Sequence, residues 1–545
     1  LNFQHGLIDI NKERLSYLLQ SVIDEDKIVK ITKEKINVEG KLSVNVSLDA
    51  REKIVLDAIV WTIQFPPHVR GINGSFLRYF TFGIFDIRKV KIEIGVIKSI
   101  NKQDYFWIHS RYDICNTGYT PAKGKDSINN YRMRIINCKH VFAMGTGEPK
   151  VADIDRDGKA EIIFATQNGY LYVVEEGRKV DWKCDVKGEV SYIPPELGDV
   201  DGDGYYEVLI ANDNFVESPK VGLRVVDKDG KLLAEWLNPE GGFPLGEPRA
   251  ADIDGDGKDE ILIGLLGDEE RGNKFYALKY ENGSLKELWN YPAYFWIKYT
   301  PAVADLNNDG KMEIIFTSYD LCVYCLDANG NLLWKYITKG GIQHAYTGAI
   351  ERKLAHPVVA DINNDGYMEI IVNTAIYDKP EWSAVYCLDY EGNLIWKYEP
   401  NKPLERCIAV GDINNDGNVE IVFGDANGTI YVLKNDGSPL WKHTLPEFYF
   451  KKGPISVAVD FALFYPYIAD LDGNGYAEII VVAWYHGVFI FSHDGKLIKQ
   501  WPRPLGEFGY RGGAIADIDG DGDLEIIVCQ AGKLGLFGKV GIIDQ

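Results

Sequence analysis

Residues 361–372 read "DINNDGYMEIIV". Acidic or amide side chains stand at alternate positions, at Asp361, Asn363 and Asp365, and a glycine follows at once. Glu369 then opens a run of β-branched residues of the kind that fills a buried strand. The same twelve-residue pattern occurs eight times, at residues 153–164, 199–210, 252–263, 305–316, 361–372, 412–423, 470–481 and 517–528.

The spacing of these copies indicates the fold. Successive copies begin 46 to 58 residues apart, and a unit of about 50 residues suits a four-stranded propeller blade. Each unit has a short apolar segment before the motif and a β-branched strand after it. An alternating strand and a closing strand such as "LLWKY" (332–336) follow. The sequence therefore predicts an all-β propeller with four strands in each repeat.

The last copy bears on the number of blades. Only residues 529–545 follow it, which is too little chain for a full set of strands. Propellers commonly close their ring with a strand from the other end of the domain, which removes open sheet edges. We expect a strand from about 131–143 to do this, which gives an eight-bladed β-propeller over residues 131–545. Seven blades with one additional motif is the alternative.

Residues 1–130 carry no copy of the motif. Residues 11–26 have an Asn at the position of an N-cap and apolar residues at helical spacing, which predicts a short helix. Residues 35–48 and 88–100 alternate apolar and polar side chains as strands do. We expect a small β-rich N-terminal domain that contains one short helix.

The polar part of the motif predicts a cation site. Side chains at its first, third, fifth and ninth positions can converge if the chain turns tightly at the glycine. A set of oxygen ligands without His or Cys suits Ca²⁺ and argues against zinc. We expect up to eight structural Ca²⁺ ions. Their ligands would be Asp153, Asp155, Asp157, Glu161, Asp199, Asp201, Asp203, Glu207, Asp252, Asp254, Asp256, Glu260, Asp305, Asn307, Asp309, Glu313, Asp361, Asn363, Asp365, Glu369, Asp412, Asn414, Asp416, Glu420, Asp470, Asp472, Asn474, Glu478, Asp517, Asp519, Asp521 and Glu525.

Over about residues 145–535 the repeats resemble FG-GAP/VCBS-type repeats, the calcium-binding blades of integrin-α-like propellers. The resemblance implies a calcium-binding β-propeller. The chain departs from the pattern in two ways. Its ninth position holds Glu in place of Asp in every copy, and the Phe-Gly…Gly-Ala-Pro signature is largely missing.

Long loops that contain aromatic and basic residues lie between the repeats, on the side that the motif turns do not use. Such loops can plug the central hole, contact another protein or a second copy of this chain, or bind a glycan by stacking and charged hydrogen bonds. Seven tryptophans recur in the closing strands, where packing between blades explains them. The candidate ligand-binding residues are Trp296, Trp382, Trp484, Tyr294, Tyr346, Tyr449 and Tyr510.

Charge and composition narrow the function. The net charge of −21 argues against a nucleic-acid partner, and no run of about 18 apolar residues predicts a membrane span. Calcium loops of this kind favour an extracellular or cell-surface location. We expect a binding module for a glycan or a protein, used in adhesion or in surface assembly, rather than an enzyme.

The alternative is a polysaccharide lyase of the rhamnogalacturonan-lyase type, which would act on an acidic polysaccharide. Its architecture and calcium motif resemble those of this chain. A lyase needs a base and positive charge near the channel mouth. The candidates are His344, Arg352, His356, Arg406 and Arg511, together with Glu148 and Glu247 at equivalent positions of two repeats.

Overall fold

A computed structural model of the chain divides into two units, residues 1–105 and 106–545. Within the first unit the structure describes residues 7–9, 30–31, 35–37 and 46–47. Within the second it describes residues 113–544 apart from a series of gaps, of which the longest are 137–146, 213–220, 342–351, 503–509 and 531–538. The division lies upstream of the boundary near residue 130 that the sequence suggested.

The described part of the first unit consists of four short strands. β1 (Leu7–Asp9) pairs antiparallel with β3 (Lys35–Asn37), and β2 (Lys30–Ile31) pairs with β4 (Val46–Ser47). The strand predicted over 35–48 thus includes β3 and β4. The predicted helix over 11–26 and the predicted strand over 88–100 lie outside the described residues.

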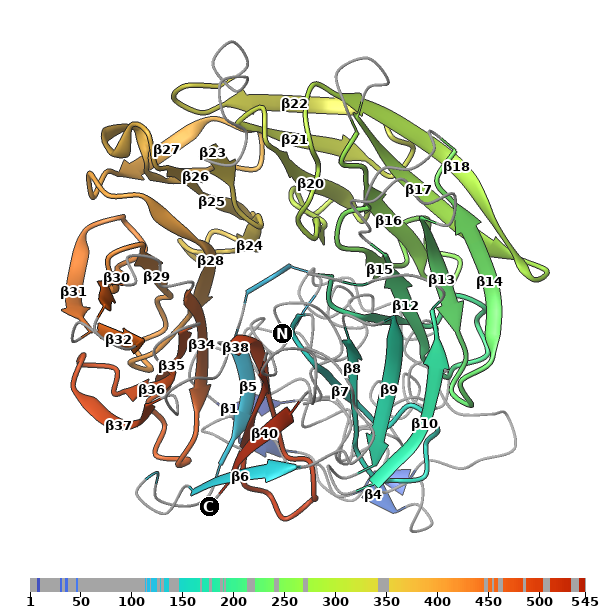
Figure 1. The fold of residues 1–545 in the computed structure, drawn as a ribbon, viewed down its shortest axis with the longest axis horizontal. Coiled ribbons are helices and arrows are strands. Elements are labelled where there is room, and N and C mark those ends of the chain that lie inside the picture. Colours follow the sequence, from blue (N-terminus) through green and yellow to red (C-terminus); the bar gives the residue numbers. More distant parts are fainter. Residues whose placement is uncertain are drawn as a thin grey trace. The chain divides into compact units, whose positions relative to one another are not determined.

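The second unit is a ring of antiparallel sheets (Figure 1). We number as blades 1 to 7 the sheets whose four core strands follow one another in the chain. Blades 1 to 4 are β7 (Lys150–Ala152), β8 (Glu161–Thr166), β9 (Tyr170–Glu175) and β10 (Lys179–Asp185); β11 (Glu196–Gly198), β12 (Glu207–Ala211), β13 (Gly222–Val226) and β14 (Leu232–Leu237); β15 (Arg249–Ala251), β16 (Glu260–Gly264), β17 (Asn273–Glu281) and β18 (Ser284–Ala293); and β19 (Ala302–Ala304), β20 (Glu313–Ser318), β21 (Cys322–Asp327) and β22 (Leu332–Ile337). Blades 5 to 7 are β23 (Arg352–Leu354), β24 (Val358–Ala360), β25 (Glu369–Ile376), β26 (Val385–Leu388) and β27 (Leu394–Tyr398); β28 (Leu404–Gly411), β29 (Glu420–Asp425), β30 (Thr429–Leu433) and β31 (Pro439–Thr444); and β34 (Phe464–Asp470), β35 (Glu478–Ala483), β36 (Gly487–Phe491) and β37 (Leu497–Pro502).

The predicted number of eight blades is corrected to the alternative of seven. Seven blades are each complete within one stretch of chain, whereas the eighth copy of the motif lies in a composite sheet. That closing sheet has the order β38 (Tyr510–Ala516), β39 (Glu525–Gln530), β40 (Lys539–Asp544) and β6 (Arg132–Ile136). The reason is chain length, because only β40 follows the last motif strand and a blade of its own needs a further strand.

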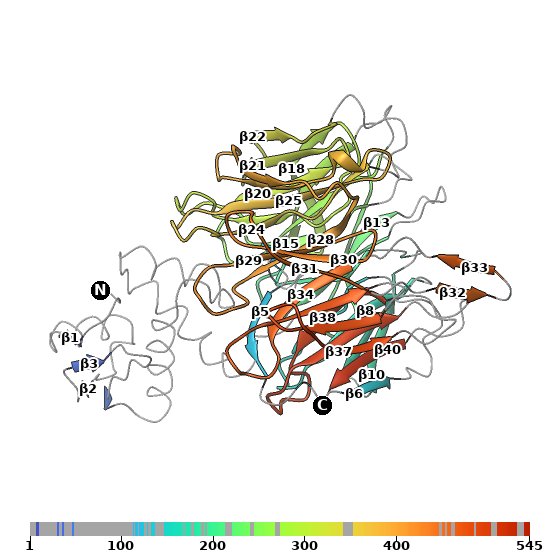
Figure 2. The same cartoon turned by 90° about the vertical axis from the view of Figure 1, so that its left-hand side faces the viewer.

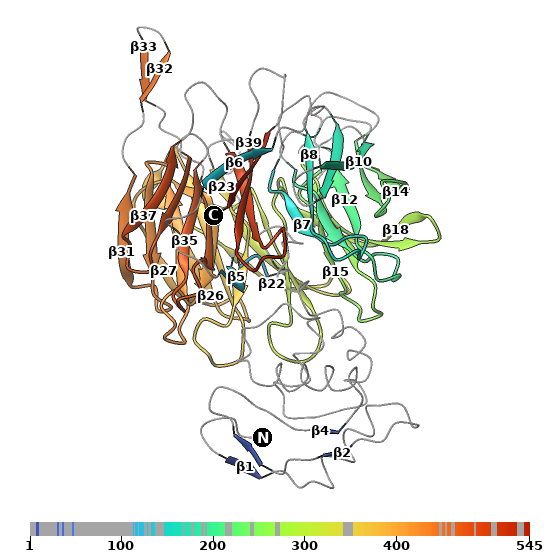
Figure 3. The same cartoon turned by 90° about the horizontal axis from the view of Figure 1, so that it is seen from below.

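The strand that completes the closing sheet comes from the region proposed for it. β6 lies within 131–143 and pairs antiparallel with β40, from Ile136 opposite Val540 to Arg132 opposite Asp544. A further strand, β5 (Tyr119–Lys123), adds in parallel to β34 of blade 7. The hairpin of β32 (Tyr449–Lys452) and β33 (Ile455–Ala458) forms a separate two-stranded sheet that extends away from the ring (Figures 2 and 3).

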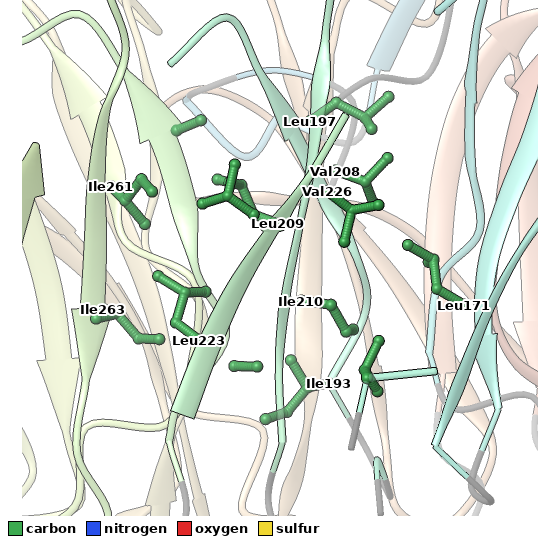
Figure 4. Close-up of a cluster of buried hydrophobic side chains, with 14 of the residues drawn as sticks. Leu171, Ile193, Leu197, Val208, Leu209, Ile210, Leu223, Val226, Ile261 and Ile263 are labelled. Atoms are coloured by element: carbon green, nitrogen blue, oxygen red, sulfur yellow. The ribbon is translucent and has the colours of Figure 1, made fainter. Parts of the chain in front are cut away.

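The hydrophobic core lies between neighbouring blades. The second strand of every blade is buried along its whole length, as its β-branched sequence predicts. Side chains of blade 2 such as Leu197, Leu209 and Leu223 pack with Leu171 of blade 1 and Ile263 of blade 3 (Figure 4). Each blade therefore buries both of its faces against its neighbours. Among the described residues the one helical segment is a 3₁₀ turn, η3 (Pro380–Trp382).

Tryptophans of the outer strands connect successive blades, as their recurrence predicts. Trp334 of β22 donates its indole N–H to the carbonyl oxygen of Tyr390, in the hairpin of the next blade, at 2.9 Å. Its ring lies against Gly392 of the same hairpin. Trp182, Trp289, Trp396 and Trp441 make the equivalent hydrogen bond.

A segment before the first blade crosses the inner strands of several blades. We call residues 113, 115–117 and 119–124 the central segment. The carbonyl oxygen of Cys115 accepts from Val359 N–H in blade 5, and that of Thr117 accepts from Val410 N–H in blade 6. Tyr119 is then aligned with Ile468 of blade 7. The central segment therefore bonds to one blade after another through alternate residues.

Candidate functional site

The eight acidic loops fold in the same way. In each, the N–H of the glycine at the sixth position donates to Oδ2 of the first Asp, at 2.8 to 3.0 Å. The N–H of the second residue donates to Oε2 of the Glu at the ninth position, at 2.8 to 3.1 Å. These glycines have φ between 86° and 93°, which explains why no other residue occurs there. We number the loops 1 to 8 in chain order.

The remaining carboxylate oxygens are left for another partner. Oδ1 of Asp361, Asp470 and Asp517 is buried and has no hydrogen-bond donor. In loops 1, 2, 3, 7 and 8, three carboxylates bring one oxygen each within 4.8 Å of one another. In loops 4, 5 and 6 an Asn holds the third position. All 32 predicted ligands thus lie in loops whose donor sets fit a hard cation such as Ca²⁺, and the identity of the ion remains a prediction.

The glutamates of these loops carry the electrostatic mark of crowding. Burial, followed by the nearby aspartates, raises the pKa of Glu161 to about 8 and that of Glu478 to about 8. The same causes raise the pKa of Glu525 to about 9. A bound cation would favour the charged form of each of these side chains.

Loop 3 already contains a positive charge. Lys279 of β17 places its Nζ atom 2.6 Å from Asp254 Oδ2, 2.9 Å from Asp256 Oδ2 and 2.7 Å from Glu260 Oε1. The three carboxylates are predicted calcium ligands. Burial opposes the charge on this ammonium group, but its hydrogen bonds outweigh burial and raise the pKa of Lys279.

Some of the loops also contact the next loop around the ring. Asn308 of loop 4 donates from Nδ2 to the carbonyl oxygen of Gly366 in loop 5. Asn364 of loop 5 donates to that of Gly417 in loop 6 at 2.8 Å. Both asparagines have φ of 62°, in the left-handed region that Asn tolerates better than most residues. Loops 4 to 6 therefore form a bonded series.

A second polar cluster lies where the inner strands begin, at the end of the blades away from the acidic loops. His356 Nε2 lies 2.7 Å from Glu247 Oε2, and the hydroxyl of Thr300 donates to the same oxygen at 2.9 Å. Glu247 and His356 are 8% and 7% exposed. The sequence placed Glu247 and His356 among the groups that could meet here, and the structure brings them into contact.

The contacts of this cluster extend around the ring. Arg249 pairs with Glu196 at 2.8 Å, and both side chains are fully buried. Arg249 also donates to Oδ1 of Asn116 in the central segment. Asn116 in turn donates to the carbonyl oxygen of Pro357 at 2.9 Å. We call Glu196, Glu247, Arg249, Thr300 and His356 the inner ionic cluster.

Charge within the inner ionic cluster is stabilised by pairing. Burial disfavours a charged imidazole at His356, but Glu247 more than offsets this and raises the pKa of His356 to about 10. For Glu247, burial acts to raise the pKa, and the charge and hydrogen bond of His356 lower it overall. At neutral pH the two side chains form a buried ion pair.

Comparison with known families accounts for the repeats. The model of the FG-GAP-like repeat matches residues 199–263, 252–316, 412–481 and 470–528. This chain is an FG-GAP β-propeller. A second family model, the lambda-carrageenase β-propeller domain, matches residues 299–347 of this FG-GAP propeller.

Similar proteins support the fold over most of the FG-GAP propeller. A quinohemoprotein alcohol dehydrogenase of Pseudomonas putida HK5 superposes with a TM-score of 0.56 and 11% identity, over 81% of this chain and 80% of that one. A rhamnogalacturonan lyase of Bacillus licheniformis has a TM-score of 0.47 and 16% identity, over 77% and 73% of the two chains. A lambda-carrageenase of Pseudoalteromonas carrageenovora is 27% identical over 132 residues, which is 24% of this chain and 12% of that protein. The chain therefore spans about an eighth of the length of this curated relative.

The predicted ligand-binding aromatic residues have different surroundings. Tyr294 is 58% exposed. Trp296 donates its indole N–H to the carbonyl oxygen of Gly267 at 2.7 Å and stacks on Phe295. Trp382 is half-buried and lies under the Lys379 ammonium group at 3.9 Å. Tyr294 is thus the candidate with most of its ring available to a ligand.

The other candidates lie partly or wholly outside the described residues of the FG-GAP propeller. Trp484, Tyr346 and His344 belong to segments that the structure does not describe. Only the backbone is described for a further set, which lies in strands β32, β38, β23 and β28: Tyr449, Tyr510, Arg511, Arg352 and Arg406. Of the lyase candidates only His356 has a described side chain. No helix in the described part of the chain is long and apolar enough to cross a bilayer.

Two features of the site had no signal in the sequence motif. Lys279 stands outside the twelve-residue pattern, and its position beside loop 3 follows only from the register of β16 and β17. Asn116 belongs to a segment without a repeat, and its contacts join residues more than 130 positions apart in the chain. A comparison of the residue opposite the motif Glu in each repeat could have singled out Lys279.

Proposed function

We propose that this FG-GAP β-propeller is a calcium-stabilised binding module that acts outside the cell or at its surface. The observation that carries the proposal is the repeated acidic loop, in which one carboxylate oxygen fixes the turn and another is buried without a donor in Asp361, Asp470 and Asp517. Oxygen ligands in that arrangement suit Ca²⁺, and sites of this type in extracellular modules fill at about millimolar calcium.

The face at the start of the inner strands is the proposed binding face. It carries the exposed ring of Tyr294 and the loops that differ most between repeats. Binding residues are commonly found on variable loops of a rigid scaffold. The local match to a lambda-carrageenase favours a polysaccharide, especially an acidic one, as the ligand over a protein or a second copy of this chain.

A polysaccharide lyase is the second candidate. His356 and Glu247 are a potential acid and base near the channel mouth, but both are buried and bonded to each other. A group that takes a proton from a substrate has to come within hydrogen-bond reach of it. The burial of this pair therefore favours binding over catalysis.

The test combines binding and product formation. The full chain is applied to an array of sulfated and uronic-acid polysaccharides in calcium and in EDTA, and the same mixtures are followed by ultraviolet absorbance for unsaturated product. We expect calcium-dependent binding without product. Tyr294→Ala should weaken the binding, whereas Tyr367→Ala, an exposed tyrosine of loop 5, should not. Unsaturated product would establish the lyase, and binding that is the same in EDTA would contradict the role of calcium.

A further inference from the structure

Loop 3 differs from the other acidic loops in the residue that faces its motif glutamate. The pairing of Ile261 with Leu278 places Lys279 beside Glu260 on the neighbouring strand. In blades 1 and 4 the residue opposite the motif glutamate is itself acidic: Glu175 faces Glu161, and Asp327 faces Glu313. Blade 3 therefore has a cation where these blades have a further carboxylate.

The hairpin of blade 3 makes this position available. In blade 4, Asp327 is used within its own turn, where Oδ1 accepts from the N–H groups of Asn329 and Asn331. In blade 3 the strand continues to Glu281 and the turn is formed by Asn282 and Gly283, beyond Lys279. The side chain of Lys279 is thus free of the turn and extends to loop 3.

The ammonium group of Lys279 is fully used by loop 3. It has three N–H donors, and it has three carboxylate partners within 2.6 to 2.9 Å, in Asp254, Asp256 and Glu260. The Lys279 side chain is 13% exposed and that of Glu260 is fully buried. Hydrogen bonds between charged groups are stronger than neutral ones, and partial burial reduces their screening by solvent.

A divalent ion and this ammonium group compete for the same oxygens. A Ca²⁺ ion bound to these three carboxylates would lie within a few ångströms of Nζ, and like charges at that distance repel. For the ion to bind, Lys279 would have to leave and give up all three hydrogen bonds. We propose that Lys279 takes the place of a metal ion in loop 3, so that loop 3 carries no calcium when the other loops do. This inference rests on the proposed calcium binding by the acidic loops.

Blade 6 supplies a matched control. Lys434 occupies the corresponding position there, because Ile421 pairs with Leu433 and so places Lys434 beside Glu420. Within the part of the chain that the structure describes, Lys434 forms no ion pair with the carboxylates of loop 6. A lysine at this position is therefore not enough, and the distinguishing feature is the three-fold contact of Lys279.

The test counts bound calcium in the full-length protein. Wild type, Lys279→Met and Lys434→Met are stripped with EDTA, equilibrated with calcium and freed of excess ion, and bound calcium is measured by elemental analysis and native mass spectrometry. We expect Lys279→Met to bind about one more ion per chain than wild type, since a neutral side chain leaves the loop 3 ligands to the metal. Lys434→Met should match wild type. Equal calcium in wild type and Lys279→Met would overturn the inference and leave the proposed function standing. Calcium in none of the proteins would overturn both.

A second pair of variants tests the same inference without disturbing Lys279. Asp254→Asn in loop 3 and Asp201→Asn in loop 2 change the same motif position, and both side chains lie at the surface or close to it. If Lys279 replaces the ion, Asp254→Asn leaves the calcium content unchanged, whereas Asp201→Asn lowers it by about one ion per chain. A loss of the same size in both variants would overturn the inference.

Discussion

Gly392 is a single residue on which the contact between two blades depends. Its φ is 85°, and a Cβ atom at this position would lie 2.6 Å from Cδ2 of Trp334. The glycine therefore serves the hairpin turn and the seat of the indole ring together. Gly283 in blade 3 has nearly the same φ, 84°, but nothing lies within 4 Å of its would-be Cβ.

We expect Gly392→Ala to destabilise the protein more than Gly283→Ala does. Both substitutions carry the backbone cost of a positive φ, about 1 kcal/mol, but only the first forces the Trp334 ring to move. Displacing a buried ring adds about 1–3 kcal/mol. Thermal melts of the two variants at fixed calcium measure the difference. Equal melting temperatures would show that the ring contact contributes nothing to stability.

The buried pair of His356 and Glu247 gives stability a dependence on pH. The pKa of His356 is raised to about 10, above its ordinary value, so the protonated ring stabilises the fold. This contribution is complete below the ordinary pKa of a histidine, about 6.5, and is lost as pH rises toward 10. The pKa of Glu247 is lowered, so its contribution is lost only as pH falls into the acidic range.

His356→Gln is therefore expected to lower the melting temperature more at pH 6 than at pH 9.5. Removing one partner of a buried ion pair leaves the other charge uncompensated, at a cost of about 3–5 kcal/mol. His443→Gln on the outer strand β31 is the control and should show a much smaller effect at either pH. A loss for His356→Gln that does not change with pH would contradict the ion pair.

At the scale of elements, the acidic loop and the two strands beside it could be predicted from the sequence. The motif contains its own reasons: the glycine that turns, the Asp that accepts from it, and the β-branched run that continues as a buried strand. The closing-strand tryptophans were equally readable, because a residue that recurs at one place in each repeat has a contact that recurs as well.

Features that break the repeat could not be predicted in this way. The boundary between the two units was expected near residue 130, but the central segment belongs with the propeller from Phe106 onward. Its bonds to Val359 and Val410 depend on where distant inner strands meet, and no local pattern encodes that. The side chain of Lys279 likewise acquires its role only through strand register.

The loops predict a response to metal removal that depends on pH. In the metal-free protein the pKa values of Glu161, Glu369 and Glu525 are raised to about 8, 7 and 9, above those of the unfolded chain. The protonated groups therefore stabilise the fold at low pH, and this contribution is lost as pH rises through 7 to 9. We expect the protein in EDTA to melt at a lower temperature at pH 8 than at pH 5.5.

Added calcium should remove most of that difference, because the ion stabilises the charged carboxylates and binds better as pH rises. Differential scanning fluorimetry at the two pH values, in calcium and in EDTA, measures all four conditions. Magnesium at equal concentration is the control, since it demands a stricter geometry. A metal-free protein that is more stable at pH 8 than at pH 5.5 would contradict this account of the loops.

At the scale of the whole molecule, the ring depends on one pair of strands from distant parts of the chain. β40 pairs on one side with β39 and on the other with β6. If β40 is absent, β6 and β39 each present an unpaired edge, which is a template for association with another chain.

Deletion of residues 539–545 is therefore expected to lower the melting temperature and to cause association that increases with protein concentration. Seven blades remain intact in this variant, so its circular dichroism should stay that of a β protein. Analytical ultracentrifugation over a range of concentrations measures the association. The control is replacement of the β32–β33 hairpin by a short Gly-Ser linker, because that hairpin pairs only with itself. A truncated protein that stays monomeric with an unchanged melting temperature would show that β6 does not need its partner.

The pairing of β6 with β40 also sets an order of events during synthesis. Arg132–Ile136 leave the ribosome about 400 residues before their partner strand does. At about 5–20 residues per second, β6 waits for about 20–80 seconds beside blades that already have all their strands. Tyr119 of the central segment waits nearly as long for Ile468. The nascent chain thus carries its two earliest strands without partners throughout most of translation, and the ring can close only when the last strand has emerged.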